Sequence, residues 1–134
     1  MPPKYLLDTD IRIYFIRHRE PRLVRRIAAH AHHSVISAIT LGGLQFGRAG
    51  SSNPAAVQPA IDLLRESFPA APITAEVAEP YGRIRADLRS RGTPTGANEL
   101  WIAAQALAAN LILVTNNEKE FRRVPGLKIQ NWAR

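Results

Sequence analysis

Three consecutive apolar residues near the start of the chain, Tyr5–Leu7, end abruptly at the carboxylate of Asp8. An apolar run without polar alternation is typical of a strand that is buried on both faces of a parallel sheet. Ligand sites in open parallel sheets lie outside the carboxyl ends of the strands, which is where Asp8 would stand. Asp8 or Asp10 can equally cap a following helix, because Asp is a favoured N-cap residue. The position alone leaves both interpretations open.

The rest of the chain alternates short apolar strands with amphipathic helices. Further strands are expected at 34–37, 111–114 and 127–129, with a short edge strand at 71–73. Helices are expected over 10–18, from 21 onward, from 38 onward, and over 55–68, 74–91 and 95–109. This alternation predicts a single α/β domain over residues 1–134, a three-layer α/β/α sandwich with a mainly parallel sheet of four to five strands.

The composition narrows the classes of function. The chain carries 18 Lys and Arg against 11 Asp and Glu, a net charge of +7, and most of its cations are arginines. Arginine binds phosphate bidentately, so the surplus favours RNA or DNA as a partner, although a generally basic proteome would also produce it. The chain has no cysteine, which excludes thiolate metal sites. It also has no apolar run long enough for a signal peptide or a membrane span, so we expect a soluble, cytoplasmic protein.

Two groups of arginines are candidates for phosphate contacts. One surrounds Arg17, and the other includes Arg85 on the helix expected over 74–91. A solvated helix face is the commoner explanation for such groups, and Arg17 and Arg85 are therefore only candidate substrate-binding residues. A third basic group, His30 with His32 and His33, is not expected to bind metal, because no carboxylate or thiolate accompanies it.

Oxygen ligands follow two of the expected strands. Asp8 ends the first strand, Thr115 and Asn117 follow the strand at 111–114, and Glu99 lies near the start of the helix before that strand. The fold can bring these segments to one edge of the sheet. Oxygen ligands suit Mg²⁺ or Mn²⁺ and not zinc. On a basic protein, such a site predicts phosphodiester hydrolysis, in which metal ions activate water and stabilise the leaving oxygen.

Five separated blocks of sequence resemble the PIN-domain toxins of the VapC type. The blocks are 5–9, 37–41, 81–85, 94–98 and 114–121, and they occur in the family's order over nearly the whole chain. The resemblance implies a PIN-like fold, a homodimer, Mg²⁺- or Mn²⁺-dependent cleavage of RNA, and inhibition by a cognate antitoxin.

The acidic positions of the family carry over only in part. Asp8 matches the family's first Asp, but Gly43 stands where the family has Glu, and Glu99 stands where it has Asp. Asn117 corresponds to the last acidic position, a mild departure. The resemblance therefore implies Asp8 and Glu99 as metal ligands and catalytic residues, with Asn117 and Thr115 in supporting roles.

These departures leave two functions open. Mg²⁺ demands near-ideal octahedral geometry, and Gly43 supplies neither an anionic ligand nor a base. The longer side chain of Glu99 displaces its carboxylate by about 1 Å, which can cost on the order of a hundredfold in rate. The chain is thus either an attenuated ribonuclease or a catalytically inactive PIN domain that binds antitoxin, RNA or both. An unrelated nucleotide-binding domain is disfavoured, because no Gly-rich loop follows the first strand.

Overall fold

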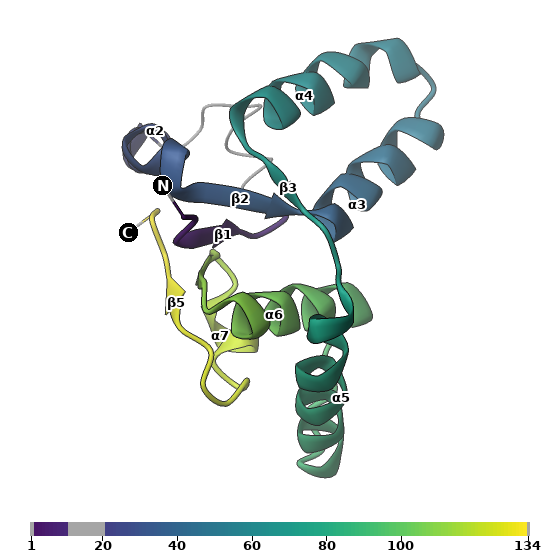
Figure 1. The fold of residues 1–134 in the computed structure, drawn as a ribbon. Helices are drawn as coiled ribbons and strands as arrows, with labels where there is room; N and C mark the ends of the chain where they lie inside the picture. The colour runs from purple at the N-terminus through teal and green to yellow at the C-terminus, as the bar shows by residue number, and fades with distance from the viewer. Residues whose placement is uncertain (1, 11–20, 134) are drawn as a thin grey trace.

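The computed structural model describes residues 2–10 and 21–133 and has helices on both faces of a five-stranded sheet (Figure 1). The strands are β1 (Tyr5–Leu7), β2 (Ser34–Ser37), β3 (Ala70–Ala71), β4 (Ile112–Val114) and β5 (Ile129–Gln130). Their order is β3-β2-β1-β4-β5, and each neighbouring pair is parallel. The expected α/β/α sandwich with a mainly parallel sheet is therefore confirmed.

The helices follow the expected periodicity closely. They are α2 (Pro21–His30), α3 (Ala38–Ala49), α4 (Pro54–Ser67), α5 (Ala75–Ser90), α6 (Ala97–Ala109) and α7 (Glu118–Phe121), with a short 3-10 helix, η1 (Ala31–His33). Proline occupies the first position of α2 and of α4, where its missing N–H is not needed. The two short helices, η1 and α7, are not among the elements expected from the sequence. The helix expected over 10–18, and Arg17 within it, lie outside the described residues.

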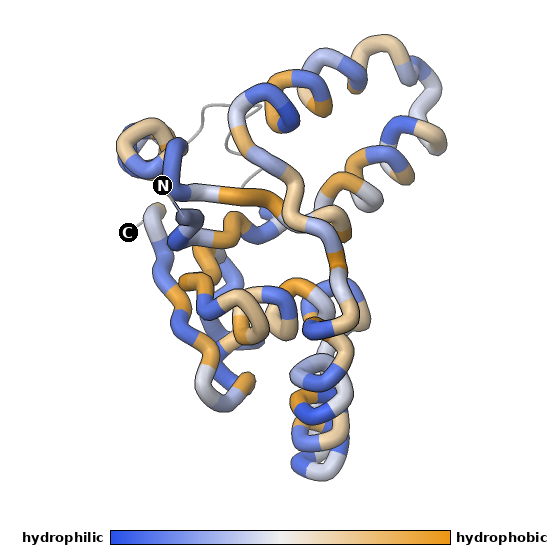
Figure 2. Tube along the Cα trace, in the orientation of Figure 1, coloured by the Kyte–Doolittle hydropathy of each residue, from blue (hydrophilic) through white to orange (hydrophobic). Residues whose placement is uncertain are grey.

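Two apolar layers explain why the strands show no polar alternation. Successive side chains of a strand point to opposite faces. Leu6 packs in a layer with Ile84 of α5 and Ile102 of α6, whereas Leu7 packs in a second layer with Leu44 of α3 and residues of α2 and α4. Figure 2 shows hydrophobic residues along the central strands and on the helix sides that cover them. Within the described ranges, no helix is both long and apolar enough to cross a bilayer.

The carboxyl ends of β1, β2 and β4 lie side by side. Leu7 pairs with Ile36 on one side and with Val114 on the other. Asp8 continues this edge, because its backbone N–H donates to the Val114 carbonyl at 2.9 Å. At the end of β2, Ser37 caps α3 by accepting the Ile39 N–H at 3.0 Å. Asp8, Thr115 and the start of α3 are thus brought to one edge of the sheet.

Candidate active site

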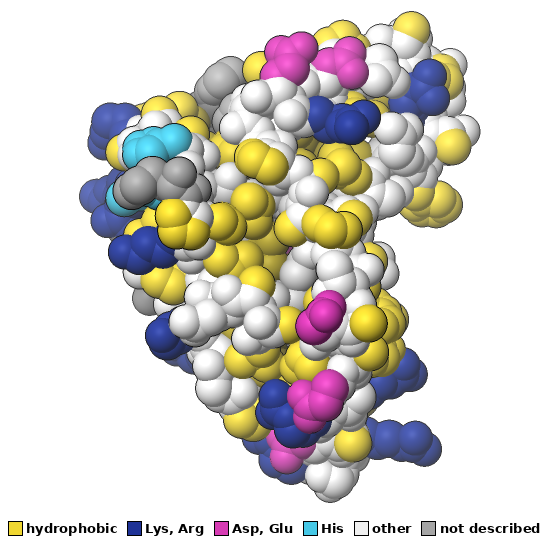
Figure 3. All heavy atoms as spheres, viewed as in Figure 1, with side chains coloured by type: hydrophobic (Ala, Val, Ile, Leu, Met, Phe, Trp, Pro, Cys, Tyr) yellow, Lys and Arg dark blue, Asp and Glu magenta, His cyan; other side chains and the backbone are white. Residues whose placement is uncertain are grey.

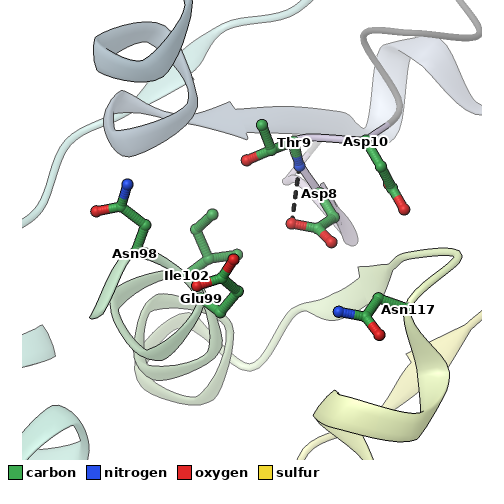
Figure 4. Close-up of a pocket in the computed structure, with 7 residues that line it drawn as sticks. All are labelled: Asp8, Thr9, Asp10, Asn98, Glu99, Ile102 and Asn117. Carbon is green, nitrogen blue, oxygen red and sulfur yellow. Dashed lines mark hydrogen bonds between the residues drawn. The ribbon is translucent and has the colours of Figure 1, made fainter. Parts of the chain in front are cut away.

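A pocket of about 290 Å³ opens at this edge of the sheet, between the end of β1 and the start of α6 (Figure 4). Its lining residues are Asp8, Thr9, Asp10, Asn98, Glu99, Ile102 and Asn117. Figure 4 shows the carboxylates of Asp8 and Glu99 directed into the same space from different elements, with Asn117 on a further side. The fold therefore brings three of the candidate residues, Asp8, Glu99 and Asn117, to one pocket, while Arg85 does not line it.

Asp8 is held in one orientation by two hydrogen bonds. It is only 7% exposed, and its carboxylate accepts the Thr9 N–H at 2.8 Å and the Thr115 hydroxyl at 2.7 Å. Thr115 is fully buried, and its Oγ1 also accepts the Asn117 N–H at 2.9 Å. Thr115 thus positions Asp8 and the Asn117 backbone, and it does not line the pocket itself.

The charge of Asp8 is unfavourable in the protein without a bound cation. Burial raises the pKa of Asp8 above its ordinary value, the hydrogen bonds from Thr115 and Thr9 oppose this rise, and the nearby carboxylates of Glu99 and Glu120 add to it. A cation in the pocket would favour the ionised form and reverse the effect of burial. The electrostatics of the pocket therefore favour a positive ligand.

The substitution Asp8→Asn should stabilise the metal-free protein at neutral pH. Because the folded-state pKa of Asp8 is raised, the folded state binds the proton more tightly than the unfolded state. The contribution of Asp8 to the free energy of unfolding therefore falls as pH rises from the pKa of Asp8 in the unfolded state to its pKa in the folded state. Above this range the contribution stays low. We expect urea unfolding in a chelator, from roughly pH 4 to pH 8, to show that the free energy of unfolding of Asp8→Asn increases relative to that of the natural chain as pH rises. A constant difference over this range would contradict the raised pKa.

Glu99 enters the pocket from the first turn of α6. An acidic side chain is favoured there, because the helix N-terminus carries a partial positive charge. The carboxylate folds back against Gly96, the residue that precedes the helix. A Cβ built on Gly96 would lie 3.2 Å from the carboxyl carbon of Glu99 and closer still to Oε2. The present orientation of Glu99 therefore depends on the absence of a side chain at position 96.

Gly43 on α3 is the position where the resemblance implies a carboxylate. It lies one helical turn after Thr40, a buried residue whose Oγ1 is 3.3 Å from the Thr9 hydroxyl. Helical side chains lean toward the N-terminus, so a side chain at position 43 would extend over Thr40 toward Thr9, which lines the pocket. A Cβ at position 43 would meet no atom within 4 Å. The site thus has room for the carboxylate that the sequence lacks.

Two acidic residues near the pocket were not among the candidates from the sequence. Glu120, in α7, accepts a hydrogen bond from Nδ2 of Asn117 at 2.6 Å. Asp10 was considered only as a cap, yet it lines the pocket and accepts the Asn116 N–H at 3.1 Å. The spacing of Glu120, one helical turn after Asn117, is a signal that the sequence did contain.

The donor set fits a hard cation. The carboxylates of Asp8 and Glu99 and the side-chain oxygen of Asn117 are the ligands that Mg²⁺ and Mn²⁺ prefer, and they do not suit zinc. The described part of the chain holds no group of three or more His, Cys, Asp or Glu side chains arranged around one metal position. Because no third carboxylate shares one metal position with Asp8 and Glu99, the site is expected to bind such an ion weakly.

Comparisons with known proteins agree with this geometry. The model of the PIN domain family matches residues 5–127. Ribonuclease VapC1 of Haemophilus influenzae (strain R2866) is 36% identical over 132 residues, which cover 97% of this chain and 98% of that protein. The tRNA(fMet)-specific endonuclease VapC of Salmonella typhimurium is 32% identical over 97% of this chain and 98% of its own length. The solved structure of VapBC-1 from nontypeable H. influenzae covers 100% of both chains with a TM-score of 0.88 and 35% identity. The resemblance inferred from the sequence blocks is confirmed.

Proposed function

Because this chain belongs to the PIN-domain family, we propose that it is an endoribonuclease of the VapC type that cleaves RNA with the help of Mg²⁺ or Mn²⁺. The observation that carries the proposal is the meeting of Asp8 and Glu99 in one pocket at the carboxyl edge of the sheet. Relatives named as ribonucleases align with nearly the whole chain, which supports RNA as the substrate.

Each residue of the site has a separate task in this proposal. Asp8 and Glu99 would hold the cation, and the chemistry that a bound cation would supply is activation of water and stabilisation of the leaving oxygen. Thr115 fixes the orientation of Asp8 through its 2.7 Å hydrogen bond. Asn117 offers a further oxygen and is itself held by Glu120. Because position 43 supplies no carboxylate, cleavage is expected to be attenuated.

A cognate antitoxin is the proposed protein partner. The similar VapBC structures support it. Inhibition by such a protein is what the resemblance to VapC-type toxins implies. We also propose a homodimer, because the helix that the sequence predicts over 10–18 would be apolar on most sides and would need a covering surface. We also propose a cytoplasmic location, where an RNA substrate would be available.

The substitution Asp8→Ala should abolish both metal binding and cleavage. Asp8 is the buried carboxylate whose charge a cation compensates, so its loss removes the main ligand. Titration calorimetry with Mn²⁺ and initial cleavage rates of bulk tRNA, with and without a chelator, measure the two effects. Bulk tRNA is chosen because one relative is named as a tRNA(fMet)-specific endonuclease.

The same experiment separates the two functions that the sequence leaves open. Metal-dependent cleavage by the natural chain that disappears in Asp8→Ala supports the enzyme. Metal or antitoxin binding without any cleavage would instead identify an inactive PIN domain. Equal Mn²⁺ affinity in both proteins would remove Asp8 from the site.

A further inference from the structure

Two arginines on α5, Arg85 and Arg89, form a cationic pair one helical turn apart. Both line each of two adjoining hollows. The first hollow also includes Gly82, Ala86 and Ser90, and the second includes Leu88, Pro94, Thr95 and Leu100. Figure 3 shows Lys and Arg side chains projecting from the part of the molecule that contains α5. The arginine pair is therefore the shared wall of two depressions in the surface.

The charge of the arginine pair is not neutralised by the protein. Two other arginines form ion pairs one turn away: Arg83 of α5 with Glu79 at 3.4 Å, and Arg91, the C-cap residue of α5, with Asp87 at 2.6 Å. Among residues 2–10 and 21–133, neither member of the arginine pair has a carboxylate within ion-pair distance. Two uncompensated guanidinium groups beside a hollow are suited to an anionic ligand.

One member of the arginine pair is held in place by an aromatic column. The guanidinium of Arg85 donates to the Tyr81 hydroxyl at 2.5 Å and lies 5.8 Å from the centre of that ring. Tyr81 stacks on Trp101, with ring centres 3.7 Å apart and planes inclined by 8°. Trp101 follows Glu99 by two residues on α6. A cation fixed in this way loses little freedom when it binds a phosphate.

The second hollow adjoins the segment that carries the candidate active site. It includes Pro94 and Thr95, and the next residues along the chain lead through Gly96 to Asn98 and Glu99, which line the catalytic pocket. The Thr95 hydroxyl is buried and makes no hydrogen bond within the described structure. A chain of phosphates that leaves the catalytic pocket across the start of α6 would therefore meet the arginine pair.

We propose that Arg85 and Arg89 hold phosphates of the RNA strand to one side of the cleavage position. This inference rests on the proposed function and adds the path of the substrate to it. Arginine grips phosphate through two parallel hydrogen bonds, which is the geometry a phosphodiester backbone offers. Gly82, which has no side chain, leaves the α5 surface beside the pair open to the strand. The expected contact is with the backbone and therefore carries little sequence preference.

Salt dependence of RNA binding tests the arginine pair against a matched control. In an Asp8→Ala background, which prevents cleavage, we compare Arg85→Gln/Arg89→Gln with Arg83→Gln/Arg91→Gln. Both double variants remove two charges from the same helix, but only the first removes uncompensated ones. The affinity for a fluorescein-labelled single-stranded RNA of mixed sequence is measured over a range of NaCl concentrations. Each phosphate contact on a single strand contributes about 0.7 to the slope of log affinity against log salt.

The two double variants should therefore differ in the salt dependence of RNA binding. Removing the arginine pair is expected to reduce the slope by about 1.4, the contribution of two phosphates, while the control changes it much less. Gly82→Glu, placed in open space, should weaken binding with both arginines present, whereas Gly82→Ala should not. Circular dichroism melting checks that every variant is folded.

Three results would overturn the proposal. The first is an equal loss of slope in both double variants, which would indicate general charge and not a defined contact. The second is an unchanged slope in Arg85→Gln/Arg89→Gln. The third is an unchanged slope together with a loss of dimerisation or of binding to an acidic protein, which would assign the arginine pair to a protein partner. If the natural chain cleaves RNA through Asp8 but Arg85→Gln/Arg89→Gln leaves the salt slope unchanged, only this proposal fails. If that double variant reduces the slope but the natural chain does not cleave RNA, only the proposed activity fails.

Discussion

The substitution Gly43→Glu is expected to raise metal-dependent RNA cleavage by roughly a hundredfold, the scale at which a misplaced or missing catalytic group acts. A carboxylate at this position would extend over Thr40 toward Thr9 at the wall of the pocket. There it would add a further acidic side chain to those that line the pocket, Asp8, Asp10 and Glu99. The space is open, because a Cβ at position 43 has no neighbour within 4 Å. The substitution should also stabilise α3 by up to roughly 1 kcal/mol, since Gly is a poor helix former.

Two matched variants test whether the gain in cleavage requires a carboxylate at position 43 or only an added negative charge. Gly42→Glu adds the same charge one residue earlier, where a Cβ also meets open space, but the helix turns that side chain away from the row of Thr40 and position 43. Gly43→Gln adds a side chain of the same shape without the charge. Initial cleavage rates with Mg²⁺ or Mn²⁺ should rise strongly only for Gly43→Glu. A similar gain for Gly42→Glu would indicate a non-specific effect of charge.

Combining Gly43→Glu with Glu99→Asp should raise cleavage further and more than additively, because both side chains would serve one metal ion. Activity in the natural chain that each change increases would indicate an attenuated enzyme. Activity that appears only in the double variant would indicate an inactivated toxin. If none of the folded variants cleaves RNA, position 43 and the pocket beside it are not the site of catalysis.

The edge of the sheet at which the candidate site lies could be predicted from the pattern of strands, whereas the geometry of the side chains within it could not. The apolar runs before Asp8 and Thr115 predicted two strands of a mainly parallel sheet that end at one edge, and the structure adds that they are neighbours, with Leu7 paired with Val114. That rule concerns the backbone and needs only the pattern of burial. It does not specify side-chain rotamers, and so the contact of Glu99 with Gly96 was not predicted.

The residue four positions before each arginine of the α5 region indicates whether that arginine forms an ion pair, which the composition alone does not. Arg83 and Arg91 each have a carboxylate four residues earlier, Glu79 and Asp87, which predicts the ion pairs that the structure has. Four residues before Arg85 stands Tyr81, and four residues before Arg89 stands Arg85 itself. The spacing therefore separates paired from unpaired arginines. What the sequence could not supply is the neighbourhood of Pro94 and Thr95, because that contact joins separate elements.

The substitution Gly96→Ala is expected to lower cleavage by roughly a hundredfold with little change in stability. The backbone at Gly96, with φ −57° and ψ 145°, is available to any residue, so Ala introduces no backbone strain. The new Cβ would instead collide with the carboxylate of Glu99, the far end of a flexible side chain that can move away. A shift of about 1 Å is enough for the expected loss. Thermal melting, Mn²⁺ titration calorimetry and initial cleavage rates follow the three effects separately.

Shortening Glu99 should remove the effect of Gly96→Ala. In Glu99→Asp the carboxylate ends one methylene earlier and no longer reaches back over position 96, so an added Cβ has nothing to displace. Gly96→Ala should therefore lower Mn²⁺ affinity strongly in the natural chain and only slightly in Glu99→Asp. Calorimetry makes this comparison even if the natural chain cleaves RNA too slowly to measure. An equal loss of affinity in both backgrounds would show that Gly96 acts through the start of α6 and not through Glu99, because a purely structural effect does not depend on the length of that side chain.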